Sequence, residues 1–468
     1  MKNGDKKGFW NFVDRLEGDK VVWMIVLLLI LISIVAVFSS TPQLALQTHS
    51  DRLSIVREQL MVAVLGLGLI VALYSIRKIG IYRFFAQFGY LVSIAMLVIL
   101  ASHQSLGFIK PVMLNHAWRI LKIGPVQIHV FEFVKVAMIL YLAWAVTAYN
   151  KGEFWIANHF RDNEKLGWLA KPIWQRIIYI YIPIFSTAAC MMVGSLSSTI
   201  FIGGIMFLTI LLGGFKLKHV LASGVVAIGF ILLLIAFNAP FPADKKPFPH
   251  LDTALGRIAS KSHEQDPMTI IMTASKSSPE YQDAVDKLQQ PMSAEIAIRE
   301  GKILGKGPGR STQRYVTPVM FEDYMFSFIV EEYGLIGGII VIILYLSLLS
   351  RGSMIVRGCD NAFAKTTVAG LVLLIALQAM MHMMVNVDIG PMTGQTLPMI
   401  SHGNSSFLMF SIAFGIILSI SRMAKAKMAR EDAHAEPLTV HHEETRPDEV
   451  KDTLEDLETL ESIDSGME

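Results

Sequence analysis

The chain has 468 residues, of which 53% are hydrophobic and 17% are charged, and its mean hydropathy is +0.49. This composition excludes an ordinary soluble domain and indicates a polytopic helical membrane protein. The formal net charge of +2 indicates no nucleic-acid partner. The two cysteines, Cys190 and Cys359, support neither a disulfide framework nor a thiolate metal site.

Apolar runs of nearly 20 residues recur along the chain, which is the length needed to cross a bilayer. They fall near residues 21–38, 59–75, 84–101, 130–148, 175–193, 197–214, 218–237, 324–349, 366–386 and 404–421. The first run follows a long charged segment and precedes no small-residue cleavage site, so we expect a retained anchor. The sequence therefore predicts an all-α integral membrane protein with about ten transmembrane helices.

Lysine and arginine are distributed unevenly between the two sets of connecting loops. One set contains, among others, Lys2, Arg77, Lys151, Lys216 and Arg351. The short loop 387–403, which belongs to the other set, contains no lysine or arginine. Because basic loops stay in the cytoplasm, we expect both termini to be cytoplasmic and 238–323 to be one large external loop.

Three regions follow from these assignments. Residues 1–20 are expected to form a cytoplasmic N-terminal segment, and 21–423 to form the ten-helix membrane domain. Residues 424–468 begin basic and become acidic, which predicts a disordered, charged cytoplasmic tail. The middle of the external loop, 260–303, is of mixed polarity and is expected to hold short amphipathic helices.

The stretch Gly305–Gly338 carries the strongest functional signal. A glycine-rich basic segment leads to Glu322 and Asp323, and the following span contains Glu331 and Glu332. Acidic groups inside a membrane span are costly and are usually retained for a reason. A cationic loop beside an external carboxylate suits an anionic, lipid-linked substrate. The alternative is a plain loop, a helix cap at Asp323 and a buried structural ion pair.

A second group of charged residues surrounds the start of the span near 130. Glu132 and Lys135 are three positions apart, so they share one helix face and can form an ion pair. Such a pair is either structural or part of a polar cavity. Arg119, in the preceding external loop, has the forked donor geometry that suits phosphate. Contact with lipid headgroups is its alternative role.

The external stretch Asn386–Ser406 is rich in glycine, proline and serine. Such residues make tight turns whose backbone N–H groups can bind anions. Ser401, Ser405 and Ser406 add uncharged hydrogen-bond donors. His402 has a suitable pKa for proton transfer, but a single surface histidine is more often inert.

Three separated stretches resemble motifs of the SEDS family, which includes FtsW, RodA and SpoVE. The first contains Asn115, Arg119, Gly124, Glu132 and Lys135; the second contains Gly305, Ser311, Gln313, Arg314, Pro318, Asp323, Phe326, Glu331, Glu332 and Gly337; the third contains Asn386, Thr393, Gly394, Leu397, Pro398, Ser401, Gly403, Ser405 and Ser406. The resemblance runs from about residue 20 to 425. Departures occur near Phe131, Ser197 and Phe321, and Glu322 stands where the family has threonine.

The resemblance implies a peptidoglycan glycosyltransferase that polymerises lipid II at the outer face of the cytoplasmic membrane. It assigns the catalytic carboxylate to Asp323. The residues expected to bind substrate are Arg119, Glu132, Lys135, Gln313, Arg314, Glu332, Ser401, Ser405 and Ser406. We expect a class B penicillin-binding protein (an FtsI-like transpeptidase) and other divisome proteins as partners. No covalent cofactor is expected, although a divalent cation (Mg²⁺ or Mn²⁺) is a candidate.

The long polar termini favour a septal role in cell division, and an elongation paralogue of the RodA type is the alternative within the family. A lipid II flippase and a noncatalytic divisome scaffold are the alternatives outside glycosyl transfer. Asp323 distinguishes them, because neither needs a base at the external surface. Asp323 is preferred over Glu322 because adjacent residues at a helix start point about 100° apart, so both are not expected to face one substrate.

Overall fold

The computed structural model describes residues 17–47, 51–105, 107–114, 117–124, 126–155, 159, 167–238, 240, 267–273, 275–276, 278–317, 320–389 and 394–435. Three motif residues lie outside these ranges, namely Asn115, Pro318 and Thr393. Most of the expected N-terminal segment and of the expected tail also lies outside them. The chain divides into two units at Lys425, and of the second only a helical continuation to Ala435 is described.

All ten expected spans are helical. In the described residues, seven helices are long and apolar enough to cross a membrane. They are α2 (Lys20–Ser40), α4 (Arg52–Tyr74), α5 (Ile79–Ser102), α6 (Val130–Lys151), α15 (Met325–Arg357), α16 (Ala362–Asn386) and α17 (Asn404–Ala435). The other expected spans correspond to α8 (Pro172–Arg176), η2 (Ile177–Tyr181) and α9 (Ile182–Met192), which run on from one another, to α10 (Leu196–Leu212) and to α11 (Leu217–Asn238). The polytopic helical class is confirmed.

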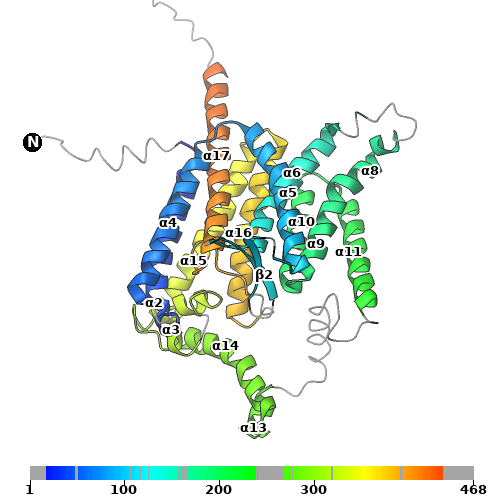
Figure 1. Cartoon of the computed structure of the whole chain (residues 1–468). Helices are drawn as coiled ribbons and strands as arrows, with labels where there is room; N and C mark the ends of the chain where they lie inside the picture. The colour runs from blue at the N-terminus through cyan, green and yellow to red at the C-terminus, as the bar shows by residue number, and fades with distance from the viewer. Residues whose placement is uncertain are drawn as a thin grey trace, which may run out of the picture. The chain divides into compact units, whose positions relative to one another are not determined.

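Shorter elements connect these spans. They are α3 (Pro42–Gln47), the 3₁₀ turns η1 (Gly167–Ala170) and η4 (Gln313–Tyr315), α13 (Pro267–Thr273) and α14 (Pro279–Gly301). The last two helices lie in the expected external loop, where amphipathic helices were predicted (Figure 1).

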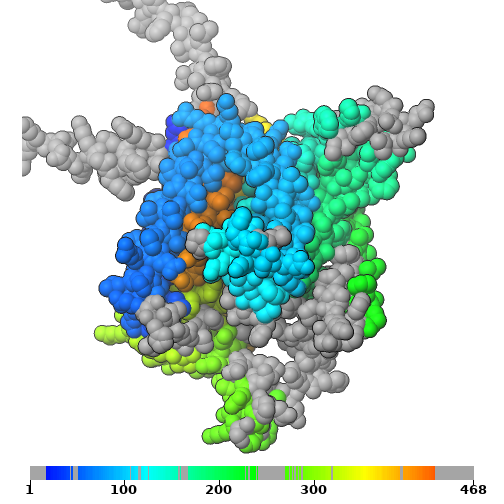
Figure 2. Space-filling view, in the orientation of Figure 1, coloured from blue at the N-terminus to red at the C-terminus, as the bar shows by residue number. Residues whose placement is uncertain are grey.

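The segment 102–129, expected to be a plain loop, contains a three-stranded antiparallel sheet among its described residues. Its strands are β1 (Ile109–Leu114), β2 (Ala117–Ile123) and β3 (Val126–His129), with β2 in the centre. Isoleucine, valine or leucine recurs in each strand, and Gly124 supplies the positive φ that the connection after β2 requires. Figure 2 shows the sheet in cyan on the surface in view, beside the orange of α17.

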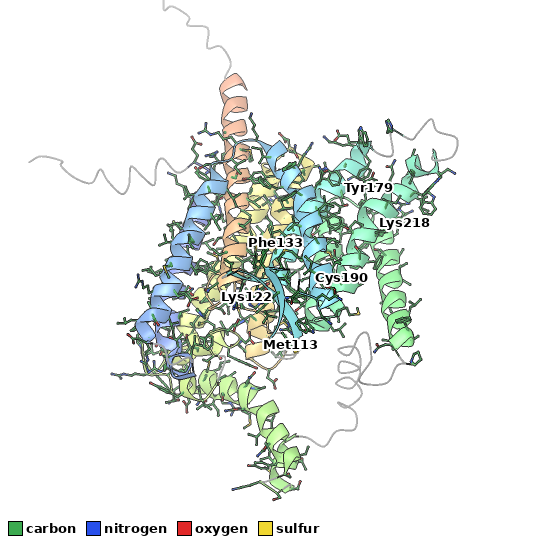
Figure 3. The ribbon with its side chains drawn as sticks, in the orientation of Figure 1. Met113, Lys122, Phe133, Tyr179, Cys190 and Lys218 are labelled. Carbon is green, nitrogen blue, oxygen red and sulfur yellow. The ribbon has the colours of Figure 1, made fainter. Side chains whose placement is uncertain are left out.

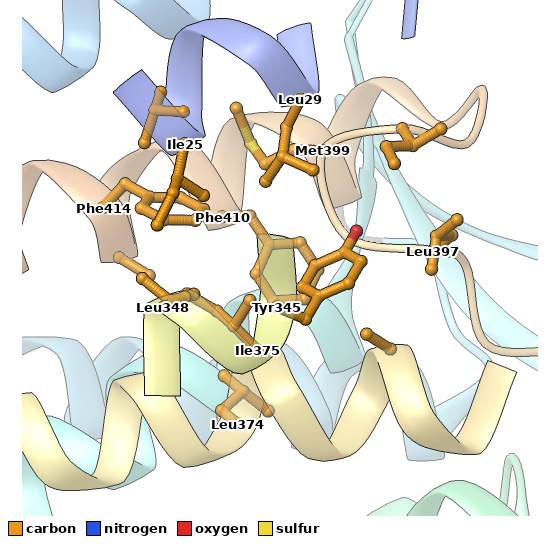
Figure 4. Packing of buried hydrophobic residues seen from close by; sticks show 14 of the residues in the cluster. Ile25, Leu29, Tyr345, Leu348, Leu374, Ile375, Leu397, Met399, Phe410 and Phe414 are labelled. Atoms are coloured by element: carbon orange, nitrogen blue, oxygen red, sulfur yellow. The ribbon is translucent and has the colours of Figure 1, made fainter. Parts of the chain in front are cut away.

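The largest hydrophobic core is formed mainly by α2, α15, α16 and α17. Figure 4 shows Leu29 of α2, Tyr345 of α15, Ile375 of α16 and Phe414 of α17 in close contact. A second core joins α5, α6, α9 and α10. Helix α6 takes part in both cores, and 83% of its most apolar stretch is buried, compared with 28% for α5. Polar residues on α6 are therefore held in the interior of the bundle.

The first helix and the last long helix meet at one end of the bundle. The backbone N–H of Asp19 donates to Oγ of Ser421 at 2.8 Å, and the Asp19 carboxylate pairs with Arg351 at the end of α15. This agrees with termini on the same side of the membrane. In Figure 3, Lys218, a residue of the basic loops, lies higher in the view than Lys122 of the sheet.

Helix α15 is interrupted at Gly334, whose φ of 71° and ψ of −175° are not helical. The glycine-rich segment supplies the missing hydrogen bonds. The N–H groups of Lys306 and Gly307 donate to the carbonyls of Glu331 and Glu332, each at 2.9 Å. A Cβ on Gly334 would lie 2.1 Å from the Ile303 carbonyl oxygen, so glycine is required here. We call this glycine-rich segment, residues 305–314, the clamp, because its N–H groups bond to α15 next to the interruption.

Candidate active site in a polar cavity

A cavity forms where β2, the start of α6, α10, the turn before α15 and the segment before α17 converge. Its lining residues are Arg119, His129, Phe131, Glu132, Ser198, Glu322, Asp323, Gly394, Gln395, Thr396, Gly403 and Ser406. Three of the predicted motif regions therefore meet in one place. The expected catalytic Asp323 and the expected substrate ligands Arg119, Glu132 and Ser406 all belong to it.

Glu322 and Asp323 both line this cavity, which corrects the expectation that only one would face it. Residues 320–323 form turns, and α15 begins only at Met325. The helical spacing of about 100° between neighbours therefore does not apply to this pair. Asp323 is not the helix cap either, because the N-cap position is Tyr324.

Burial makes the two carboxyl groups weaker acids than usual. It raises the pKa of Asp323 to about 6, although the positive charge of Arg119 acts in the opposite direction. Burial, together with the charges of Asp323 and Glu132, raises the pKa of Glu322 to about 8. Each of the two neighbours therefore holds its proton more strongly than an exposed carboxyl group does, and their titrations are linked because the two groups interact.

Arg119 reaches the cavity from an irregular position in the sheet. Val112 of β1 is opposite Ile120, and Met113 is opposite Trp118, so Arg119 is the extra residue of a β-bulge. Bulges redirect a side chain out of the regular strand pattern. Burial lowers the pKa of Arg119, and the charges of Asp323 and Glu322 raise it. Within the described chain its Nε has no hydrogen-bond partner, so this donor is available to a ligand.

Glu132 and Lys135 form the expected ion pair at the inner side of the cavity. Nζ of Lys135 lies 2.6 Å from Oε1 of Glu132. The same ammonium donates to the side-chain carbonyls of Gln378 at 2.7 Å and Gln395 at 2.8 Å. All three of its donors are used, so Lys135 organises the cavity wall.

Several cavity residues were missed from the sequence. Gln395 donates to Ser198 at 3.2 Å, and the hydroxyl groups of Thr396 and Ser406 lie 2.7 Å apart. Ser406 also donates to Glu132 at 3.3 Å. A glutamine inside an apolar span, as at position 378, is a signal that could have been noticed. Ser198 lies in a stretch that departs from the family pattern, so the motif comparison gave no signal for it.

Three residues that were expected to bind substrate, Gln313, Arg314 and Glu332, lie in a separate cluster around the clamp. Arg314 donates to the Ser39 carbonyl at 3.0 Å and faces Glu332 at 3.7 Å. The backbone N–H of Gln313 points to Glu331, which also binds Lys306 at 2.8 Å. The cations of the glycine-rich segment thus neutralise the two buried glutamates, and none of these residues lines the cavity.

Ser401 and Ser405 lie next to the cavity and hold its wall. Oγ of Ser401 accepts from the Leu397 N–H at 2.9 Å, which closes a turn. Oγ of Ser405 accepts from the N–H of His129 at 3.2 Å and donates to the Gln127 carbonyl at 3.1 Å, which joins α17 to β3. His402, whose pKa is lowered by burial, binds Gln59 at 3.0 Å.

Within the described ranges, no group of three or more His, Cys, Asp or Glu side chains is arranged to hold a metal ion. The cavity does contain the neighbouring oxygen donors of Glu322 and Asp323. Mg²⁺ is usually bound through one or two carboxylates together with substrate phosphates. The two carboxyl groups fit that pattern of partial coordination.

Comparison with known proteins gives one consistent family. The FtsW, RodA and SpoVE family model, described as "cell cycle protein", matches residues 19–426. Stage V sporulation protein E of Bacillus subtilis is 25% identical over 416 residues, covering 88% of this chain and 99% of the relative. A probable peptidoglycan glycosyltransferase FtsW of Trichlorobacter lovleyi is 24% identical over 421 residues, covering 89% and 97%.

The fold also matches a solved structure. One chain of a peptidoglycan synthase complex, which coordinates polymerization and crosslinking, superposes with a TM-score of 0.60 at 19% identity. The match covers 87% of this chain and 98% of that one. At this level of identity the likeness establishes the fold.

Proposed function

The chain belongs to the FtsW, RodA and SpoVE family of cell cycle proteins, and we propose that it is a peptidoglycan glycosyltransferase that polymerises lipid II. One observation carries the proposal: a carboxylate, Asp323, and an incompletely paired cation, Arg119, line one cavity. Glycosyl transfer from a polyprenyl pyrophosphate needs a base for the acceptor and a positive charge for the leaving group.

The reaction forms one bond and breaks one. A sugar hydroxyl of the acceptor attacks the anomeric carbon of the donor, and the bond from that carbon to the pyrophosphate oxygen breaks. Asp323 takes the hydroxyl proton as general base, a role worth about 10²–10⁴-fold in rate. The bonding electrons leave with the pyrophosphate, whose growing negative charge is stabilised by Arg119 in a cavity largely buried from solvent.

A divalent cation, Mg²⁺ or Mn²⁺, would be held by Glu322 and Asp323 together with oxygens of the pyrophosphate. When bound, it would supply additional positive charge to the leaving group. The partial coordination offered by the two carboxyl groups supports this extension of the proposal.

The donor's lipid tail needs an apolar path beside the cavity. An apolar groove of about 340 Å³ runs between α2 and α15, with Leu31, Val35, Ile329 and Ile340 among its lining residues. Ile329 is only six positions after Asp323 on the chain. A membrane-embedded fold suits a substrate whose reactive end lies at the surface and whose tail stays in the bilayer.

The family and the names of the relatives support the remaining parts of the proposal. We infer a location in the cytoplasmic membrane, with the cavity at its outer face, and a role at the division septum. A class B penicillin-binding protein would be the crosslinking partner, and other divisome proteins would recruit the pair. An elongation role is the alternative within the family.

The experiment is to purify the chain with its penicillin-binding partner and to measure glycan polymer made from lipid II. Polymer from the wild type and none from Asp323→Asn would support the proposal. Full polymerisation by Asp323→Asn would exclude Asp323 as the base, whereas no polymer from the wild-type complex would contradict the proposed function and would favour a scaffold or a flippase. The flippase draws less support, because the buried Lys135 is already held by three acceptors.

A further inference from the structure

The first turns of α15, from Met325 to Tyr333, form a separate block that begins two residues after Asp323. Gly334 interrupts the helix at the C-terminal end of this block. At the N-terminal end of the block, the N-cap residue Tyr324 makes no side-chain capping hydrogen bond within the described structure. The first N–H groups of a helix need partners from elsewhere, and a buried helix start without them is unstable. The orientation of this block must therefore be set by neighbouring elements.

Two buried side chains of α16 provide these partners. Oδ1 of Asn386 accepts from the backbone N–H of Ser327 at 2.9 Å. Nε2 of His382 accepts from the backbone N–H of Phe326 at 3.3 Å. Each of the two side-chain residues is only 1% exposed. Helix α16 thus caps helix α15 across the bundle.

Asn386 also holds the backbone of Asp323 directly. Its Nδ2 donates to the Asp323 carbonyl at 3.1 Å and to the His382 carbonyl at 2.7 Å. The side-chain amide of Asn386 therefore joins Asp323, which precedes the helix, to Ser327 in its first turn. This fixes the point from which the Asp323 carboxylate enters the cavity.

The cap is connected to the wall of the cavity. Because Nε2 of His382 accepts a hydrogen bond, its Nδ1 carries the proton and donates to the Gln395 carbonyl at 2.7 Å. The side chain of Gln395 binds Lys135. The position of Asp323 is thereby tied to the position of the Glu132–Lys135 pair on the opposite side.

We propose that Asn386 and His382 are positioning residues that hold Asp323 in the orientation needed for proton transfer. This inference rests on the proposed glycosyltransferase function. Polar side chains in a membrane span carry a cost that an apolar residue would avoid. Their retention is accounted for by the demand of general-base catalysis for close geometry, since a misplacement of 1 Å can lower the rate about 100-fold.

The test compares three substitutions in the complex with the penicillin-binding partner, with lipid II as substrate. Asn386→Leu and His382→Leu remove the caps, and His382→Gln keeps one acceptor and one donor. Thr366→Val is the matched control, because Thr366 is buried on the same helix and bonds only to the Ala362 carbonyl in the interactions described for it. Steady-state rates and thermal unfolding midpoints are measured for each.

We expect both leucine variants to lose about 10- to 100-fold in kcat with KM changed less than about twofold, because the base is displaced while donor binding is kept. His382→Gln should recover most of the lost rate, and Thr366→Val should resemble the wild type. A purely stabilising cap would instead lower the unfolding midpoint and leave kcat of the folded fraction unchanged, which would overturn the inference.

If the leucine variants do not fold, Asn386→Asp tests the positioning role of Asn386 instead. It keeps the acceptor for Ser327 and removes the donor to the Asp323 carbonyl. Its kcat, measured on the plateau of the pH profile, should also fall about 10-fold or more. Wild-type kcat in this variant, with Asp323→Asn inactive, would overturn the inference alone. Activity in Asp323→Asn would overturn the assignment of the base on which the inference rests, and only the absence of polymer from the wild type would overturn the proposed function itself.

Discussion

Glu322 and Asp323 are neighbours in the sequence, and both side chains line the cavity that contains Arg119. One guanidinium can balance one of these two carboxylates. The charge of Asp323 raises the pKa of Glu322, and burial raises the pKa of both. The two acids are therefore chemically distinct, and the distinction can be tested.

Asp323→Asn should abolish glycan polymerisation, with a loss of about 10²–10⁴-fold, because the amide cannot accept the hydroxyl proton. Glu322→Gln should retain much of the activity, since the amide keeps a hydrogen-bonding group of similar size and Asp323 remains to accept the proton. Turnover of lipid II is measured for both variants, with expression and partner binding as controls. Retained turnover in Asp323→Asn with loss in Glu322→Gln would move the base to Glu322.

The polymerisation rate should fall as the pH drops through about 6, because Asp323 must be ionised to act as a base and its pKa is about 6. Arg119 lowers that pKa, so Arg119→Met should move the acidic limb of the pH profile to higher pH. It should also raise KM for lipid II through the loss of a phosphate donor. An unshifted acidic limb would show that another group controls the rate.

The contribution of Glu322 to the stability of the folded protein should decrease as the pH rises from about 4.5 to about 8. The folded state raises the pKa of Glu322 from 4.5 to about 8, so within this window it binds more protons than the unfolded state. The contribution of Glu322 to stability therefore falls with increasing pH. Glu322→Gln should make the unfolding midpoint less dependent on pH between about 5 and about 8. A variant with the wild-type slope would contradict the assignment.

Lys135→Met should destabilise the protein by about 3 kcal/mol, because it leaves Glu132, whose side chain is only 14% exposed, without its cation. The double variant Lys135→Met with Glu132→Gln should recover part of this loss. Thermal unfolding of the single and double variants measures the coupling. Strictly additive effects would mean that the pair contributes no coupling energy.

Gly334→Ala should destabilise the clamp, because the added Cβ would lie 2.1 Å from the Ile303 carbonyl oxygen and φ would remain positive. Gly203→Ala is the matched control, since a Cβ added at Gly203 would meet no other atom within 4 Å in the described structure. We expect a lower unfolding midpoint for the first variant and an unchanged or slightly higher midpoint for the second, because alanine favours the interior of helix α10. Equal midpoints would show that the kink is easily rearranged.

The sequence by itself determined the features that depend on local spacing. Apolar runs predicted the positions of the helices, and three-residue spacing predicted the ion pair between Glu132 and Lys135. Motif order identified Asp323 and Arg119, which the structure brings into one cavity. The positions of the helices and the ion pair could be predicted because helix periodicity and bilayer length act on neighbouring residues. The roles of Asp323 and Arg119 stay predictions that rest on the family resemblance.

Only the tertiary structure decided which polar groups meet. Lys135 finds Gln395, 260 positions away, and Asn386 finds the backbone of Asp323. The cations of the glycine-rich segment pair with Glu331 and Glu332, and a β-bulge directs Arg119 into the cavity. In a bundle of apolar helices each buried charge or backbone group must find a partner, and which partner lies within reach depends on how distant helices pack.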